Sequence, residues 1–344
     1  MSVAKVFRWA LGLSALGSVC AYNLAPEPGA FVQPLGWPAP VYRFANNPGT
    51  AAGRELGRML FYEPALSRDS SISCASCHAP AMAFTHADHR VSHGMAGRLG
   101  SRNAPGLFNL AWNTSFHWDG GVNHLETQAV NPLTHPNEMD ASLPQLLVRL
   151  NASPAYRARF YRAFADSVVT TPRLLKALAQ FTVSLESSNS KYDKYVRHEP
   201  GGEFTDQELS GLTLFRANCA SCHREPLFTN NGFANNGLPV DSLYNDLGRA
   251  AITGRPADRY QFRVPTLRNI ELTSPYMHDG RFQRLREVLR HYTTGIQPGP
   301  TLAPELQQPL LLSPNQQKDI LAFLLTLTDR DFVNNPAYQY QPND

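Results

Sequence analysis

The stretch Cys74-Ala-Ser-Cys77-His78 recurs further along the chain as Cys219-Ala-Ser-Cys222-His223. Both copies match C-x-x-C-H, the attachment signature of c-type haem. In such a motif the two thiols form thioethers to porphyrin vinyl groups, and the adjacent histidine binds the iron as proximal ligand. The alternatives are a disulfide and a zinc knuckle, but a zinc site built from four thiolates leaves both histidines unexplained. We therefore predict two covalently bound haems, one at each motif.

The duplication extends beyond the two haem motifs. Pro105-Gly-Leu-Phe-Asn109 recurs as Pro265-Thr-Leu-Arg-Asn269, and Trp118-Asp-Gly120 recurs as His278-Asp-Gly280, with the same offset in numbering for both pairs. Such internal repetition predicts two homologous haem domains. We place a secretory signal at residues 1–21, an N-terminal cytochrome c domain at 22–190 and a C-terminal cytochrome c domain at 200–335, with the join in a polar, Gly-containing stretch.

The pattern of apolar residues favours a mainly α fold, made of two cytochrome c-type haem domains with long loops. Thr205-Asp-Gln-Glu208 is a capping box that opens a helix leading into the second haem motif. The 27 prolines and 23 glycines indicate many turns, as expected of a chain that wraps a cofactor. Further helices are predicted at 54–61, 143–150, 154–164, 172–185, 285–292 and 315–327.

Composition excludes some classes of partner and state. The 344 residues carry a net charge of +3 with no run of consecutive Lys or Arg, so nothing predicts a nucleic-acid partner. A hydrophobic content of 42% is ample for a core and excludes general disorder.

The segment Met1–Ala21 has the pattern of a secretory signal. Lys5 and Arg8 precede an apolar run from Trp9 to Val19, and Val19-Cys20-Ala21 then precedes the polar, Pro-rich stretch Asn23–Pro28. That run is shorter than the roughly 20 residues that cross a bilayer, and no later segment reaches that length without charges. We expect cleavage, loss of Cys20 and a periplasmic mature chain; an uncleaved anchor and a lipidated Cys20 are the alternatives.

Taken together, these residues resemble the bacterial di-haem cytochrome c peroxidase family, which includes MauG-like enzymes. The resemblance covers about residues 51–327. It implies that the N-terminal haem reacts with hydrogen peroxide and that the C-terminal haem passes electrons or shares oxidising equivalents. It also implies a calcium ion between the haems. It is carried by the two haem motifs and by the segments Arg102–Pro105, Phe116–Gly120, Asn131–Met139, Val264–Asn269 and Tyr276–Gly280.

Three catalytic roles follow from the resemblance. Glu138 matches the distal carboxylate that moves a proton between the two peroxide oxygens, and Gln128 matches a nearby polar residue of that pocket. Trp118 matches the tryptophan between the haems, whose π-system could carry an electron hole. The ordinary alternatives are an exposed loop carboxylate for Glu138 and a core aromatic above a turn for Trp118.

The resemblance also suggests metal ligands. Asn103, Thr273 and Pro275 match positions that supply a side-chain oxygen and two backbone carbonyls to calcium, a cation that prefers oxygen ligands. The alternative for Asn103 and Thr273 is that they are ordinary turn residues.

Two positions separate the subtypes of the family. Tyr292 occupies the place where the peroxidases have the methionine that closes the second haem, as in MauG-like members, and Met277 is the rival ligand. An anionic phenolate is expected to lower the haem potential relative to methionine. His93, with His86 and His89 as nearby alternatives, matches the mobile-loop histidine of the peroxidases; its ordinary alternative is a solvent-facing loop residue.

We therefore expect a periplasmic di-haem c-type peroxidase in which hydrogen peroxide reacts at the His78 haem and Trp118 shares the oxidising equivalents with the second haem. One alternative is a MauG-like oxidase that modifies side chains, for instance tryptophan, of a partner protein. A non-catalytic di-haem electron carrier is the third interpretation. The expected partners are peroxide and either a small periplasmic donor protein or a protein substrate, with a homodimer as an expected assembly. Tyr292 favours the MauG-like version and His93 the peroxidase version.

Overall fold

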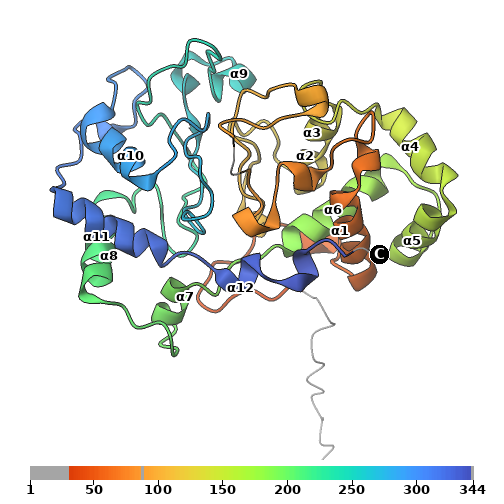
Figure 1. The fold of residues 1–344 in the computed structure, drawn as a ribbon, viewed down its shortest axis with the longest axis horizontal. Coiled ribbons are helices and arrows are strands. Elements are labelled where there is room, and N and C mark those ends of the chain that lie inside the picture. The colour runs from red at the N-terminus through yellow and green to blue at the C-terminus, as the bar shows by residue number, and fades with distance from the viewer. Residues whose placement is uncertain (1–30, 87–88, 342–344) are drawn as a thin grey trace, which may run out of the picture.

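The computed structural model describes residues 31–86 and 89–341, and these form two helical halves side by side (Figure 1). The predicted secretory signal and Cys20 lie outside the described residues. Within them, no helix is long and apolar enough to cross a membrane. The mainly α fold predicted from the sequence is confirmed.

Long loops join the helices, and the strands are two residues long each. The strands β1 and β2 pair antiparallel, with Phe233 opposite Arg263. The helices and strands are α1 Ala51–Tyr62, α2 Leu125–Gln128, α3 Val130–Thr134, α4 Leu143–Ala152, α5 Pro154–Phe164, α6 Thr171–Ser184, α7 Lys191–Val196, α8 Asp206–Asn218, β1 Phe233–Ala234, α9 Ala250–Thr253, β2 Phe262–Arg263, α10 Leu285–Arg290, α11 Pro314–Leu325 and α12 Arg330–Val333.

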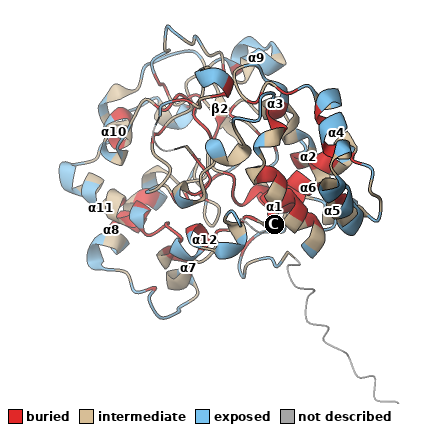
Figure 2. Cartoon of the chain, turned by 45° about the vertical axis from the view of Figure 1, so that its right-hand side comes forward, coloured by how far each residue is buried: buried red, intermediate tan, exposed pale blue. Residues whose placement is uncertain are grey.

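Each half is built on one close pair of helices. In the first half α1 packs on α6, and these are the most buried helices in Figure 2. In the second half α8 packs on α11. A glycine permits each approach: a Cβ on Gly57 would lie 2.0 Å from the carbonyl oxygen of Ala177, and a Cβ on Gly211 would lie 2.0 Å from that of Asp319. The second half thus repeats the helix pair of the first.

Capping explains where several of the predicted helices begin. Thr205 accepts a hydrogen bond from the Glu208 amide, and the Glu208 carboxylate accepts one from the Thr205 amide, so the predicted capping box opens α8. The other predicted helices are also present, as α1, α4, α5, α6, α10 and α11. The helix predicted to reach Tyr292 differs, because α10 ends at Arg290 and a π-helical turn follows over His291–Gly295.

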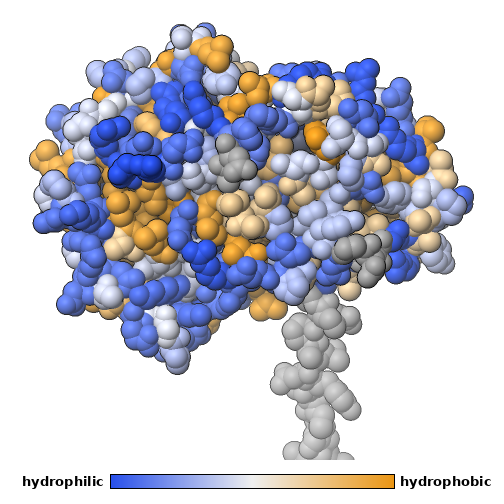
Figure 3. Space-filling model, in the orientation of Figure 1, coloured by the Kyte–Doolittle hydropathy of each residue, from blue (hydrophilic) through white to orange (hydrophobic). Residues whose placement is uncertain are grey.

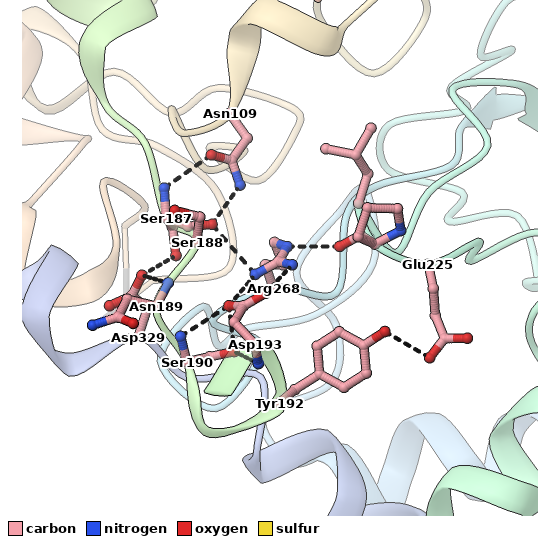
Figure 4. A network of polar contacts seen from close by, with 12 residues as sticks. Asn109, Ser187, Ser188, Asn189, Ser190, Tyr192, Asp193, Glu225, Arg268 and Asp329 are labelled. Atoms are coloured by element: carbon pink, nitrogen blue, oxygen red, sulfur yellow. Dashed lines mark hydrogen bonds and ion pairs between the residues drawn. The ribbon is translucent and has the colours of Figure 1, made fainter. Parts of the chain in front are cut away.

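A buried polar network joins the two halves through the segment between α6 and α7 (Figure 4). Arg268 is fully buried, and its two terminal nitrogens each lie 2.8 Å from a carboxylate oxygen of Asp193 at the start of α7. Asn109 of the first half and Asn269 of the second both bond to Ser187 in the same segment. The repeated asparagines therefore hold the connection from both sides.

The chain returns to the first half at its C-terminal end. Phe332 of α12 belongs to the core of the first half, and the Tyr62 hydroxyl donates to the backbone carbonyl of Tyr338 at 2.7 Å. Figure 1 shows α12 beside α1 and α6, away from α11. The last described residues thus complete the first core although the sequence places them after the second haem motif.

Candidate haem sites

The two haem motifs present their histidines in the same way. The His78 ring donates from Nδ1 to the carbonyl oxygen of Phe84 at 2.8 Å, and the His223 ring donates from Nδ1 to that of Phe228 at 3.1 Å. A carbonyl can only accept, so Nδ1 carries the proton and Nε2 keeps its lone pair. Burial lowers the pKa of both rings, that of His78 to about 4. Both histidines are therefore neutral imidazoles prepared to bind a metal through Nε2.

The four motif cysteines, Cys74, Cys77, Cys219 and Cys222, are thiols and form no disulfide. Burial raises the pKa of all four, those of Cys74 and Cys219 to about 12. Protonated, partly buried thiols next to neutral histidines fit thioether attachment of a porphyrin. Among the described residues, no three His, Cys, Asp or Glu side chains come together as a zinc site would require. The residues present at both motifs thus fit a c-type haem.

A large cavity surrounds the second haem motif. Its empty volume is about 1700 Å³ with its solvent-open mouth included, and Cys219, Cys222 and His223 line it together with apolar side chains of α10 and α11. Figure 3 shows hydrophobic side chains gathered on this face of the molecule, between α10 and α11. The size and the apolar walls suit a planar aromatic cofactor. Trp118 of the first half also lines the cavity, which therefore extends to the junction of the halves.

Tyr292 and Met277, the two candidate ligands of the second haem, line the same cavity as His223. Tyr292 lies on the π-helical turn that follows α10, and burial raises the pKa of its phenol to about 12. Asn236 donates from Nδ2 to the Met277 sulfur at 3.4 Å. The neighbouring His291 is buried and bonds through Nε2 to the Asn236 carbonyl oxygen at 2.9 Å.

Near the first haem motif, the loop that carries His93 packs against the segment that carries Glu138. The Cys77 thiol donates to the His93 carbonyl oxygen at 3.6 Å, and the Met95 amide donates to the Glu138 carbonyl oxygen at 2.8 Å. Gly94 makes this approach possible, because a Cβ there would lie 1.9 Å from the carbonyl oxygen of Asn137. The predicted distal carboxylate and loop histidine thus lie beside the first motif.

The His93 ring is one of three that gather on this loop. Its centroid is 4.1 Å from that of His89 and 6.1 Å from that of His86. The three histidines considered for the mobile-loop position are therefore neighbours in space.

Burial raises the pKa of the Glu138 carboxyl, and the charge of His135 opposes this shift. A raised pKa brings a carboxyl closer to neutral pH, where it can both give and take a proton. Gln128 ends α2 and is half-buried. Burial lowers the pKa of the His117 ring, whose Nε2 is buried without a hydrogen-bond partner among the described residues.

At the junction of the halves, Asn103 joins two repeat-related residues. The Trp118 indole donates from Nε1 to the Asn103 carbonyl oxygen at 2.8 Å, and the Asn103 amide donates to the His278 carbonyl oxygen at 2.7 Å. Trp118 is 9% exposed, as expected of a packed, rigid indole. Thr273 and Pro275, the other predicted calcium ligands, line the same cavity as Asn103.

The repeat is also visible in backbone geometry. His117 and Met277, which are related by the offset of the repeat, both have positive φ, at 63° and 75°. Asn109 and Asn269 do too, at 55° and 57°. The sequence pattern matched Trp118 to His278 but drew no attention to His117, although the same offset pairs it with Met277, a rival ligand. The constant offset between the repeats is therefore the sequence signal that could have singled out His117 as a candidate site residue.

The comparisons with known proteins agree with this geometry. Residues 51–201 match the family model described as di-haem cytochrome c peroxidase, and residues 208–328 match the cytochrome c model. The methylamine utilization protein MauG of Methylorubrum extorquens is 36% identical over 91% of this chain and 88% of its own. The cytochrome c551 peroxidase of Nitrosomonas europaea is 35% identical over 92% of this chain and 89% of its own.

A solved structure shows the same architecture. The crystal structure of a MauG-like protein associated with microbial copper homeostasis superposes with a TM-score of 0.79 at 32% identity, over 89% of this chain and 97% of that chain. The sequence resemblance, the two haem motifs and the duplicated fold therefore lead to one conclusion: the chain belongs to the di-haem cytochrome c peroxidase family of oxidoreductases, with two c-type haem domains.

Proposed function

We propose that the protein is a periplasmic di-haem peroxidase that reduces hydrogen peroxide at the haem of the first motif. When bound, that haem supplies the iron centre at which peroxide is held and reduced. His78 would hold the iron from one side, with its Nδ1–H fixed by the Phe84 carbonyl. The observation that carries the proposal is the packing of the Glu138 segment against the loop beside Cys77.

In this proposal Glu138 moves a proton between the two peroxide oxygens. The departing oxygen must be protonated as the O–O bond breaks, and a positioned carboxyl lowers that barrier. The raised pKa of Glu138 supports the role, because its carboxyl is protonated over a wider pH range than an exposed one. Gln128 is proposed as a polar neighbour of the same pocket.

Trp118 is proposed to carry oxidising equivalents to the second haem. Its indole is buried, lines the cavity around His223 and is fixed by its bond to the Asn103 carbonyl. Tyr292 is proposed as the second ligand of that haem and His93 as a loop ligand of the first. Asn103, Thr273 and Pro275 are proposed to bind calcium between the haems.

The second candidate is a MauG-like oxidase that modifies side chains of a partner protein. It is favoured by Tyr292, which lines the cavity with His223, because a phenolate stabilises the oxidised states of iron. The peroxidase interpretation is favoured by the His93 loop beside Cys77. The signal-like segment Met1–Ala21 favours a periplasmic location for either. A pure electron carrier has no use for a half-buried carboxyl at the first haem.

Glu138→Gln tests the proposal. We expect the haem-loaded variant to consume peroxide about 10² to 10⁴ times more slowly than the wild type, since the amide cannot take the proton. Glu55→Gln is the matched control, because Glu55 lies on α1 with a side chain that is 40% exposed. Stopped-flow mixing with peroxide measures both rates. Equal rates for Glu138→Gln and the control would remove Glu138 from the reaction.

A further inference from the structure

Arg263 is a buried cation that no carboxylate of the described residues balances. The residue is 8% exposed, and burial lowers the pKa of its guanidinium to about 10. Arginine is almost never buried in this way unless it is paired, because an unpaired charge loses its hydration without compensation. The position therefore calls for an anion that the described part of the chain does not supply.

The backbone of Arg263 is fixed on two sides. It ends β2 opposite Phe233 of β1, and its amide donates to the Trp118 carbonyl oxygen at 2.7 Å. Its Nε donates to the His117 carbonyl oxygen at 3.4 Å. Within the described residues the two terminal guanidinium nitrogens have no hydrogen-bond partner, and the residue lines the cavity that holds His223. The unbonded end of the Arg263 guanidinium therefore lies at the cavity.

Two other arginines of this region provide the contrast. Arg268 lines the same cavity, but both of its terminal nitrogens bond to Asp193. Arg102 pairs with Asp119 and Asp246. These cations have carboxylate partners, whereas Arg263 has none within the described part of the chain.

We propose that the missing anion is a propionate of the haem attached at Cys219 and Cys222. The two propionates are the ionised groups that a haem brings into its site, and a planar guanidinium binds a carboxylate with two parallel hydrogen bonds. Because Arg263 also holds the backbone of His117 and Trp118, the ion pair ties the second haem to the segment that carries the indole. The proposal rests on the two haems of the proposed function and is independent of the peroxide reaction.

A crystal structure of the haem-loaded protein tests the contact directly. We expect a propionate oxygen of the haem at Cys219 and Cys222 within about 4 Å of the Arg263 guanidinium, the distance of an ion pair. A guanidinium that instead faces only water, or a propionate of the haem at the first motif, would overturn the assignment. A protein that binds both haems but does not react with peroxide would still show the pair.

Variants test the same pair in solution. In Arg263→Gln, the propionate bending band of the second haem in the resonance Raman spectrum should shift, because the charged hydrogen bonds are lost. Arg263→Lys keeps the positive charge but lacks the planar guanidinium, so its band should shift less and lie nearer to that of the wild type. Arg259→Gln is the control, since Arg259 is exposed, and it should leave the band unchanged.

Each outcome of the variant experiment decides for or against the pair. A band that stays at the wild-type position in Arg263→Gln, or that shifts equally in the Arg259 control, would contradict the proposal. If Arg263→Gln fails to retain the second haem, as measured by the ratio of haem to protein, Arg263→Lys decides. A shifted band in Arg263→Lys supports the pair, and an unshifted one overturns it.

Discussion

Replacing Asp193 by Asn should strongly destabilise the protein, because it leaves Arg268 charged and buried. Arg268 is 0% exposed, and two 2.8 Å bonds to Asp193 balance its charge. Removing one partner of a buried pair costs about 3–5 kcal/mol, since the remaining charge is uncompensated. Asp193 also accepts from the Ser190 amide and hydroxyl at the start of α7, so the lower end of that range is a conservative expectation.

Urea unfolding of the haem-loaded protein, followed by far-ultraviolet circular dichroism, measures the loss. Glu271→Gln is the control, because its partner Arg330 is 59% exposed and a surface pair contributes at most about 1 kcal/mol. The double variant Asp193→Leu with Arg268→Met should recover most of the stability, since it removes both charges. An Asp193→Asn protein as stable as the Glu271→Gln control would refute the reasoning.

The structure supports three further predictions. Burial alone would raise the pKa of Asp193, but Arg268 and the Ser190 bonds outweigh it and lower the pKa. The stability that Asp193 contributes is therefore present above the carboxyl's unfolded pKa of about 3.9 and is lost as the pH falls through the lower folded value. The acid unfolding of Asp193→Asn should lack this pH-dependent loss of stability. Gly280→Ala should cost about 1–3 kcal/mol in urea unfolding, because its φ is 64° and a Cβ would lie 2.0 Å from a backbone oxygen, whereas Gly299→Ala, with nothing within 4 Å, should change little. Trp118→Phe should keep both haems and slow the oxidation of the second one after peroxide is added, as followed by stopped-flow absorbance; an unchanged rate would exclude the indole as the relay.

The features that the sequence predicted well are local or repeated. The capping box at Thr205 and Glu208 depends on two side chains one helical turn apart, and it opens α8 as expected. Each haem motif is likewise a short continuous stretch of chain. The constant offset between the repeated segments predicted two like halves, and Asn109 and Asn269 share the same positive φ.

The features that the sequence could not reveal depend on distant partners. Arg263 and Arg268 are close in sequence, yet within the described residues only Arg268 has a carboxylate partner. That partner, Asp193, lies 75 residues away in the chain, so local sequence could not distinguish the two arginines. The return of Phe332 to the first core is likewise a long-range contact. The end of α10 at Arg290 and the π-helical turn that carries Tyr292 leave no mark in the apolar pattern. The cavity-lining residues Leu285, Val288, Leu289 and Tyr292 follow one another at helical spacing across that change.

The measurement that tests the proposed peroxide chemistry most directly is the addition of one equivalent of hydrogen peroxide to the diferric protein without an electron donor. Optical and electron paramagnetic resonance spectra would be recorded over time. We predict that peroxide is consumed and that both haem signals change together, since Trp118 is proposed to share the oxidising equivalents between the haems. A long-lived doubly oxidised state would favour the MauG-like version, and a reaction that requires prior half-reduction would favour the gated peroxidase. Unchanged spectra in both the diferric and the half-reduced protein would contradict the proposed peroxide chemistry.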